Sequence, residues 1–215
     1  MSARTGQISE LVLPDGTSIT INGGGSLLYP SEFTGSERSV FLDGEALFNV
    51  KKDPEHPFVI KTSGADVKVL GTRFNLCSYQ SDPSVSLALY EGKVEFSYTD
   101  SKGAPAVCSL APGERLVCDK LKGTVVKTDF VKDDFSGWTK RSYDFKGVPL
   151  NEILKQVSRV YGITFVIRDK ALENISYYLT LAEAWSVDDF ISLLEMDSRL
   201  RISRSSDVVD IYSGK

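Results

Sequence analysis

Apolar and polar residues alternate with a period of two along most of the first 130 residues, and glycine-containing turns interrupt the alternation about every ten residues. Successive side chains of a strand point to opposite faces, so one face of each strand is predicted to be buried and the other solvated. Val67 with Val69, and Val94 with Phe96 and Tyr98, show the alternation most clearly. The pattern predicts an antiparallel sandwich, jelly roll or short solenoid.

Four predicted turns in this region share one sequence pattern, in which an apolar strand end is followed by a glycine. They lie at residues 13–17, 42–45, 89–93 and 110–114. Glycine adopts the positive φ that tight hairpin turns require. We therefore expect four β-hairpins, with turn glycines at Gly16, Gly44, Gly92 and Gly113. The turn at 42–45 would separate a strand at 39–42 from another at 45–50.

After Trp138 the apolar residues recur at helical spacing. A first helix is predicted to begin near Pro149 and to end at Gly162, and a second to begin at Ser186, where Asp189 completes a capping box. The predicted element order is βαββαββ, with a closing hairpin that turns at 205–207. We expect a mainly β protein: an all-β domain over residues 1–130, a linker over 131–138 and a small α+β domain over 139–215.

Composition narrows the function classes. The chain has 215 residues, 41% of them hydrophobic, and a net charge of −4. The first 138 residues carry 14 basic and 18 acidic groups, and the last 77 carry 11 of each. Nucleic acid is a poor partner, because phosphate binding needs clustered Lys and Arg. No apolar run reaches the length of a membrane span, and the first residues lack an apolar signal core.

The residues that enzymes use are sparse. The single histidine, His56, lies between Glu55 and Pro57 and is interpreted as a turn residue. Glu45, Glu91 and Glu114 are candidates for a pair of catalytic carboxylates, but hairpin turns usually leave acids solvated. We expect no catalytic residue, no metal ligand and no cofactor, and hence no enzyme.

The three cysteines, Cys77, Cys108 and Cys118, have no CxxC spacing, which argues against a metal site. A hairpin around residues 112 and 113 would place Cys108 opposite Val117, one position out of register with Cys118. Buried thiols are therefore favoured over a disulfide, although the spacing leaves a bridge open.

Aromatic residues of the second domain are the candidates for a binding surface. Tyr177 and Tyr178 are consecutive on a predicted strand at 176–181, so they point to opposite faces and one of them is expected to be exposed. Tyr177, Tyr178, Trp185 and Tyr212 form the candidate partner-binding set, since Tyr and Trp are enriched in interfaces. A purely structural role in the domain core is the alternative.

The turns, taken in order, resemble the extracytoplasmic region of FecR-family anti-sigma factors. The matching strings are LPDGT at 13–17, LLYP at 27–30, RSVFLDGEALFNV at 38–50, HPFVIKT at 56–62, VKVLGTRFN at 67–75, LYEGKV at 89–94 and LAPGE at 110–114. The string YDFKGVPL at 143–150 and the residues after it are similar to the STN-like domain that follows in FecR relatives of Bacteroidetes type.

This resemblance implies a role in signalling. FecR-like proteins hold an extracytoplasmic-function sigma factor with a cytoplasmic N-terminal segment, cross the membrane once, and sense a TonB-dependent transporter in the periplasm. The chain lacks the first two parts, so the resemblance implies the periplasmic sensor region of a longer, membrane-anchored protein. Its expected partner is the transporter's periplasmic signalling domain, and the sigma factor and the membrane are reached only through the missing segments. A periplasmic carbohydrate-binding jelly roll is the alternative.

Overall fold

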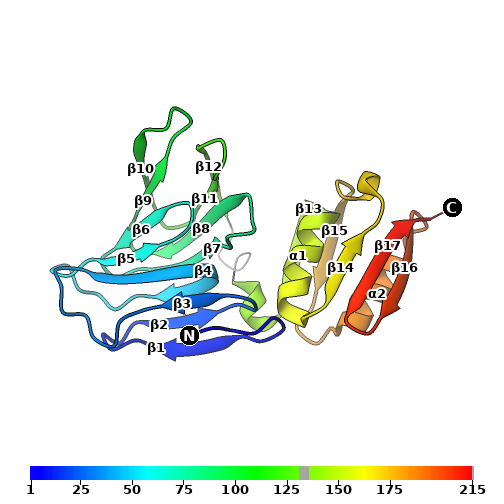
Figure 1. Cartoon of the computed structure of the whole chain (residues 1–215), viewed down its shortest axis with the longest axis horizontal. Coiled ribbons are helices and arrows are strands. Elements are labelled where there is room, and N and C mark those ends of the chain that lie inside the picture. The colour runs from blue at the N-terminus through cyan, green and yellow to red at the C-terminus, as the bar shows by residue number, and fades with distance from the viewer. Residues whose placement is uncertain (131–135, 215) are drawn as a thin grey trace. The chain divides into compact units, whose positions relative to one another are not determined.

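The computed structural model describes residues 1–130 and 136–214. These residues divide into two compact units (Figure 1). The first contains Met1–Ala3 and Ile8–Ser136, and the second contains Arg4–Gln7 and Gly137–Lys215. The first is almost entirely β and the second is α+β, which confirms the predicted fold class. Most of the predicted linker, residues 131–135, lies outside the described residues.

The first unit is one curled sheet of twelve strands. Strand β4 belongs to both halves of it: one half has the order β10-β9-β6-β5-β4-β3 and the other β1-β2-β4-β7-β8-β11-β12. All pairs are antiparallel except β4 with β5. The strands are β1 (Ser9–Val12), β2 (Ser18–Ile21), β3 (Ser26–Leu28), β4 (Arg38–Asn49), β5 (Phe58–Lys61), β6 (Asp66–Val69), β7 (Arg73–Ser78), β8 (Ser84–Glu91), β9 (Val94–Thr99), β10 (Pro105–Leu110), β11 (Glu114–Asp119) and β12 (Thr124–Asp129).

Strand β4 runs without interruption through the predicted turn at 42–45, so that prediction is wrong. Its first residues pair with β5 and β3, and its last residues pair with β2 and β7. Gly44 stands where the strand passes from one half of the sheet to the other, with φ +137°. A Cβ there would lie 2.5 Å from the Cα of Gly25. Glycine is needed at this position because two backbones meet, rather than because the chain turns back.

Of the other three glycine turns, only that at 13–17 closes a hairpin, between β1 and β2. The predicted hairpins at 89–93 and 110–114 are wrong. Strand β8 pairs with β7 and β11, whereas β9 pairs with β6 and β10, so the chain crosses from one half of the sheet to the other at Gly92. It crosses back at Gly113. An alternating pattern with a glycine marks a strand end, but it does not say which strand becomes the neighbour.

Because the chain crosses between the halves of the sheet, Cys108 and Cys118 have other cross-strand neighbours than the predicted hairpin would give them. Because β10 pairs with β9, Cys108 lies opposite Phe96 and not opposite Val117, while Cys118 lies between Val85 and Val125. All three cysteines are free thiols. Burial raises the pKa of the Cys118 thiol.

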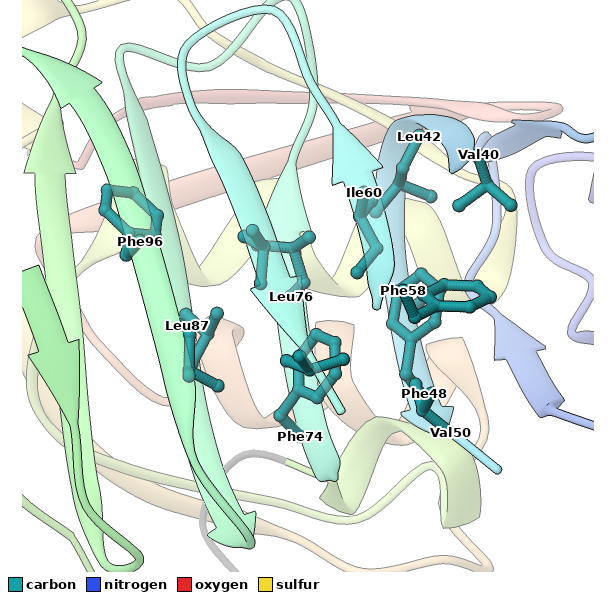
Figure 2. Close-up of a cluster of buried hydrophobic side chains, with 14 of the residues drawn as sticks. Val40, Leu42, Phe48, Val50, Phe58, Ile60, Phe74, Leu76, Leu87 and Phe96 are labelled. Carbon is teal, nitrogen blue, oxygen red and sulfur yellow. The ribbon is translucent and has the colours of Figure 1, made fainter. Parts of the chain in front are cut away.

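The core of the first unit fills the space that the curled sheet encloses (Figure 2). The rings of Phe48 and Phe74 are stacked with centroids 5.1 Å apart, and Phe58 meets Phe48 edge to face at 6.4 Å. These offset and edge-on arrangements are the ones that aromatic quadrupoles favour. Other residues shown in this core are Val40, Leu42, Val50, Ile60, Leu76, Leu87 and Phe96.

The second unit has the predicted βαββαββ order, and its strands form two sheets. Strands β13 and β15 form a two-stranded ribbon, and β14, β17 and β16 form a three-stranded sheet. Its elements are η1 (Gly137–Lys140), β13 (Tyr143–Pro149), α1 (Leu150–Tyr161), β14 (Thr164–Ile167), η2 (Lys170–Leu172), β15 (Ser176–Leu181), α2 (Val187–Glu195), β16 (Leu200–Ser205) and β17 (Val208–Ser213).

The end of α1 and the start of α2 are as predicted. Gly162 ends α1 in the left-handed conformation at φ +72°, and Ser186 with Asp189 forms the capping box of α2. Helix α1 packs on β13 and on β14, which belong to different sheets, so it joins both sheets to one core. Within the described residues, no helix is long and apolar enough to cross a membrane.

Candidate partner-binding surface

Strand β15 carries two of the four candidate residues and lies at a sheet edge. In the part of the chain that the structure describes, it pairs with β13 and with no other strand. Tyr178 is 82% exposed on the outer face of the ribbon. Its ring lies over Gly147 of β13, which has φ +66°. At this residue the register between β13 and β15 is irregular. The absence of a side chain at Gly147 thus leaves room for this aromatic ring.

The rest of the outer face is polar and internally paired. Lys146 Nζ lies 2.8 Å from Asp144 Oδ2, and Thr180 Oγ1 donates to Asp144 Oδ1 at 3.0 Å. The hydrogen bonds from Lys146 and Thr180 hold the pKa of Asp144 below its usual value. Sequence reasoning missed these three residues, although their alternate spacing with Tyr178 on paired strands could have indicated a shared face.

Tyr177 points to the opposite face and is half-buried against the core of the unit. Its hydroxyl donates to Asp197 Oδ2 at 2.7 Å, and the Asp197 carboxylate also binds Arg199, with Nη2 to Oδ2 at 2.6 Å. Burial and the hydrogen bond to Asp197 raise the pKa of Tyr177 to about 12. Hydrogen bonds from Arg199, more than that from Tyr177, lower the pKa of Asp197.

The two remaining candidates lie elsewhere in the unit. Trp185 is half-buried in the loop before α2, and its main-chain oxygen accepts a hydrogen bond from Tyr161 Oη at 2.7 Å. Tyr212 is in β17, opposite Arg201, whose guanidinium carbon lies 4.9 Å from the ring centroid. Strand β17 is paired with β14 on one side and β16 on the other, so Tyr212 does not lie on an edge strand.

Comparison with known proteins identifies the chain. Residues 1–95 match the family model described as FecR protein, and residues 142–211 match the model described as FecR, C-terminal. The chain belongs to the FecR family. A search of curated proteins gives no match.

Two solved structures of a candidate anti-sigma factor from Parabacteroides distasonis are similar to this FecR-family chain over its entire length. Both are 27% identical to it with a TM-score of 0.90, and the matches cover 100% of this chain and 99% and 98% of theirs. Together with the family models, they indicate a regulatory anti-sigma factor rather than an enzyme.

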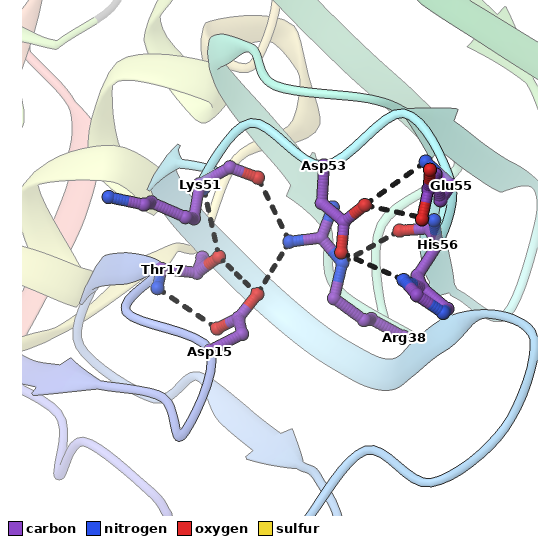
Figure 3. A network of polar contacts seen from close by, with 7 residues as sticks. All are labelled: Asp15, Thr17, Arg38, Lys51, Asp53, Glu55 and His56. Carbon is purple, nitrogen blue, oxygen red and sulfur yellow. Dashed lines mark hydrogen bonds and ion pairs between the residues drawn. The ribbon is translucent and has the colours of Figure 1, made fainter.

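The residues of this FecR-family chain that an enzyme could have used make structural contacts. His56 Nδ1 and Asp53 Oδ2 lie 2.9 Å apart on the surface, and this hydrogen bond lowers the pKa of Asp53 (Figure 3). Glu45 accepts hydrogen bonds from the side-chain amides of Asn22 and Asn75, at 2.8 and 2.9 Å. Glu114 accepts one from the main chain of Ala111. Among the described residues, no group of three His, Cys, Asp or Glu side chains could hold a metal ion.

Proposed function

We propose that this chain is the periplasmic sensor region of a membrane-anchored anti-sigma factor. In this proposal, residues 139–215 form an STN-like domain that binds the periplasmic signalling domain of a TonB-dependent outer-membrane transporter. The sigma factor is bound by a cytoplasmic segment on the other side of the membrane anchor. Membership of the FecR family and the likeness to a candidate anti-sigma factor support this role over the carbohydrate-binding alternative.

The observation that carries the proposal is that β15 pairs only with β13 among the described residues and carries the exposed ring of Tyr178. An edge strand offers unpaired N–H and C=O groups to which an incoming strand can add. A tyrosine supplies a large contact area at low entropic cost, because it has only two side-chain torsions. Edge and ring together form a surface on which main-chain pairing gives affinity and the aromatic contact gives specificity.

The charge of the second domain is consistent with a partner that is recognised by main-chain pairing and an aromatic contact. Residues 139–215 carry 11 basic and 11 acidic groups, so this domain has no net charge to steer an oppositely charged protein. The ionic groups nearest to Tyr178 on the ribbon, Asp144 and Lys146, neutralise each other. We therefore expect binding that depends weakly on salt, because no large counter-charge is being screened.

The test is calorimetric titration of the cognate transporter's signalling domain into the full chain. Tyr178→Ala is expected to weaken binding about tenfold or more, as loss of an interface anchor does. Leu121→Ala is the matched control, since Leu121 is 92% exposed on the turn between β11 and β12 of the other unit. Tyr178→Phe removes only the hydroxyl and guards against an effect of uncovering Gly147.

The outcomes separate the parts of the proposal. Wild-type affinity in Tyr178→Ala, with a normal melting temperature, would show that the β15 surface is not the site. Weakened binding in Leu121→Ala alone would place the site on the first unit. No binding of the signalling domain to the wild-type chain would contradict the proposed partner.

A further inference from the structure

Strand β15 lacks the residues with which edge strands usually oppose further pairing. Its sequence, Ser176–Leu181, contains no charged residue, no proline and no glycine. Charges, prolines and bulges at an edge oppose the addition of another strand. The other described edge strands of six or seven residues all contain such residues: Pro105 in β10, Lys127 and Asp129 in β12, Gly147 and Pro149 in β13, and Arg201 and Arg204 in β16. Among the described edges of this length, only that of β15 is therefore open to an added strand.

The direction of the main-chain groups in β15 follows from its first contact with the chain of β13. Leu150 N–H donates to Ile175 O at 2.8 Å, so the main-chain groups of Ile175 point to the side of β13. Along a strand, the main-chain groups of successive residues point to opposite sides. The residues of β15 whose main-chain groups face away from β13 are therefore Ser176, Tyr178 and Thr180. Pro149, which has no N–H, lies opposite Ser176, in agreement with this assignment.

The core of the second unit is incompletely covered along β15. Tyr177 and Leu179 point towards this core, yet both are only half-buried. Phe145, which lies opposite Leu179 on β13, is only 4% exposed. The inner side of the ribbon is thus covered along β13 and partly uncovered along β15. Apolar side chains placed beside Tyr177 and Leu179 would remove this surface from water, which is favourable.

We propose that a β-strand of the transporter's signalling domain adds to β15 and completes the core of the second unit. This inference rests on the proposed function and adds a register and a side-chain chemistry to it. The added strand pairs with the main chains of Ser176, Tyr178 and Thr180. Its side chains on the inner face are apolar and lie beside Tyr177 and Leu179, because residues on one face of paired strands contact each other.

Residue-resolved amide hydrogen exchange of the full chain, with and without the cognate signalling domain, tests the register. In the free chain, the amides of Tyr177 and Leu179 are expected to be protected by their pairing with β13, whereas those of Ser176, Tyr178 and Thr180 exchange fast. On binding, the latter three are expected to slow about tenfold or more. A contact made by side chains alone would not select alternate amides.

Exchange in the signalling domain identifies the added strand and tests its chemistry. The segment whose amides gain protection on binding is expected to alternate, with apolar residues on the face that meets Leu179. Charged residues on that face would contradict the completion of the core, because a buried charge without a partner is unfavourable.

Thr180→Pro tests the main-chain contact by a second route, with Thr180→Ala as the matched control. Both variants lose the side-chain hydrogen bond from Thr180 to Asp144, and only the proline also loses the N–H that faces the added strand. An edge strand accepts proline where the N–H faces solvent, and melting curves of both variants verify folding. Thr180→Pro is expected to bind the signalling domain about three to ten times more weakly than Thr180→Ala, the effect of one lost hydrogen bond.

The outcomes distinguish this inference from the proposed function. Binding without slower exchange at Ser176, Tyr178 and Thr180, or equal affinities of the two Thr180 variants, would overturn strand addition and leave the proposed partner in place. Slow exchange at these amides that appears without the signalling domain and increases with chain concentration would show that a second copy of this chain occupies the edge, and would overturn the proposed occupant. Absence of binding to the wild type would overturn the proposed function itself.

Discussion

Removal of Asp15 should destabilise the first unit more than removal of any surface carboxylate. Arg38, at the start of β4, has only 4% of its side chain exposed, and its Nη1 lies 2.6 Å from Asp15 Oδ2 in the turn between β1 and β2 (Figure 3). The same guanidinium donates to the carbonyls of His56 and Lys51, at 2.8 and 2.9 Å. Asp15 also accepts hydrogen bonds from the hydroxyl and amide of Thr17.

The magnitude follows from what Asp15→Ala leaves behind. Breaking a buried ion pair by removing one partner costs about 3 to 5 kcal/mol, because the other charge stays buried without compensation. The two carbonyls that remain on Arg38 reduce this loss, while the hydrogen bonds lost at Thr17 add about 1 kcal/mol each. We expect a net loss of about 3 to 4 kcal/mol, which corresponds to a fall in melting temperature of roughly 6 to 16 °C for a protein of this size.

The assay must report on the correct unit. Both tryptophans, Trp138 and Trp185, lie in the second unit, so urea unfolding of the first unit should be followed by far-UV circular dichroism. Asp53→Ala is the control, because the Asp53 pair with His56 is exposed and is expected to contribute about 0 to 1 kcal/mol. A loss in Asp15→Ala no larger than in this control would refute the reasoning. Asp15→Ala with Arg38→Met should recover most of the loss, since no charge is then buried.

Three further results are expected. Gly113→Ala should lower the free energy of unfolding by about 1 to 3 kcal/mol, because only its positive φ opposes a side chain. Gly44→Ala should cost about 1 to 3 kcal/mol more, because its Cβ would overlap the backbone of Gly25 just before β3. Equal losses for the two variants in urea titrations would contradict this backbone contact. The raised pKa of Tyr177 means that its stabilising effect is complete below about pH 10 and lost as pH rises towards about 12, so Tyr177→Phe should flatten the fall in the free energy of unfolding over that range. Native Cys118 should react with iodoacetamide more slowly than the two half-exposed cysteines, measured by mass spectrometry, and an equal rate would show that its thiol is accessible.

Local sequence was sufficient wherever the determinants lie within a few residues of one another. The C-terminal end of α1 follows from Gly162, and the N-terminal start of α2 follows from the Ser186 capping box. Both act on the adjacent turn of helix. The order of strands and helices in the second unit follows from the change of period. Alternation likewise places Tyr177 and Tyr178 on opposite faces, which the structure confirms.

Tertiary structure alone decided which strands meet. The glycines at 44, 92 and 113 stand in the same local pattern as Gly16, yet only the Gly16 turn closes a hairpin. Strand pairing depends on contacts between residues far apart in the chain, and the period of two is identical whichever neighbour a strand acquires. The same limit applies to the candidate surface: β15 is an edge and β17 is central because of partners that their own sequences do not specify.

Buried polar contacts could not be predicted from the sequence either. Nothing in the residues around Arg38 distinguishes it from a solvated arginine, because its burial depends on a turn 23 residues earlier and on the loop after β4. Nothing in Arg4–Gln7 indicates that these residues belong to the same unit as α1, more than 140 residues later. Sequence determined the end of α1, the start of α2 and the alternation within the strands, since capping and periodicity act locally. The tertiary structure decided which edges stay open and which charges are buried, since these depend on packing between distant segments.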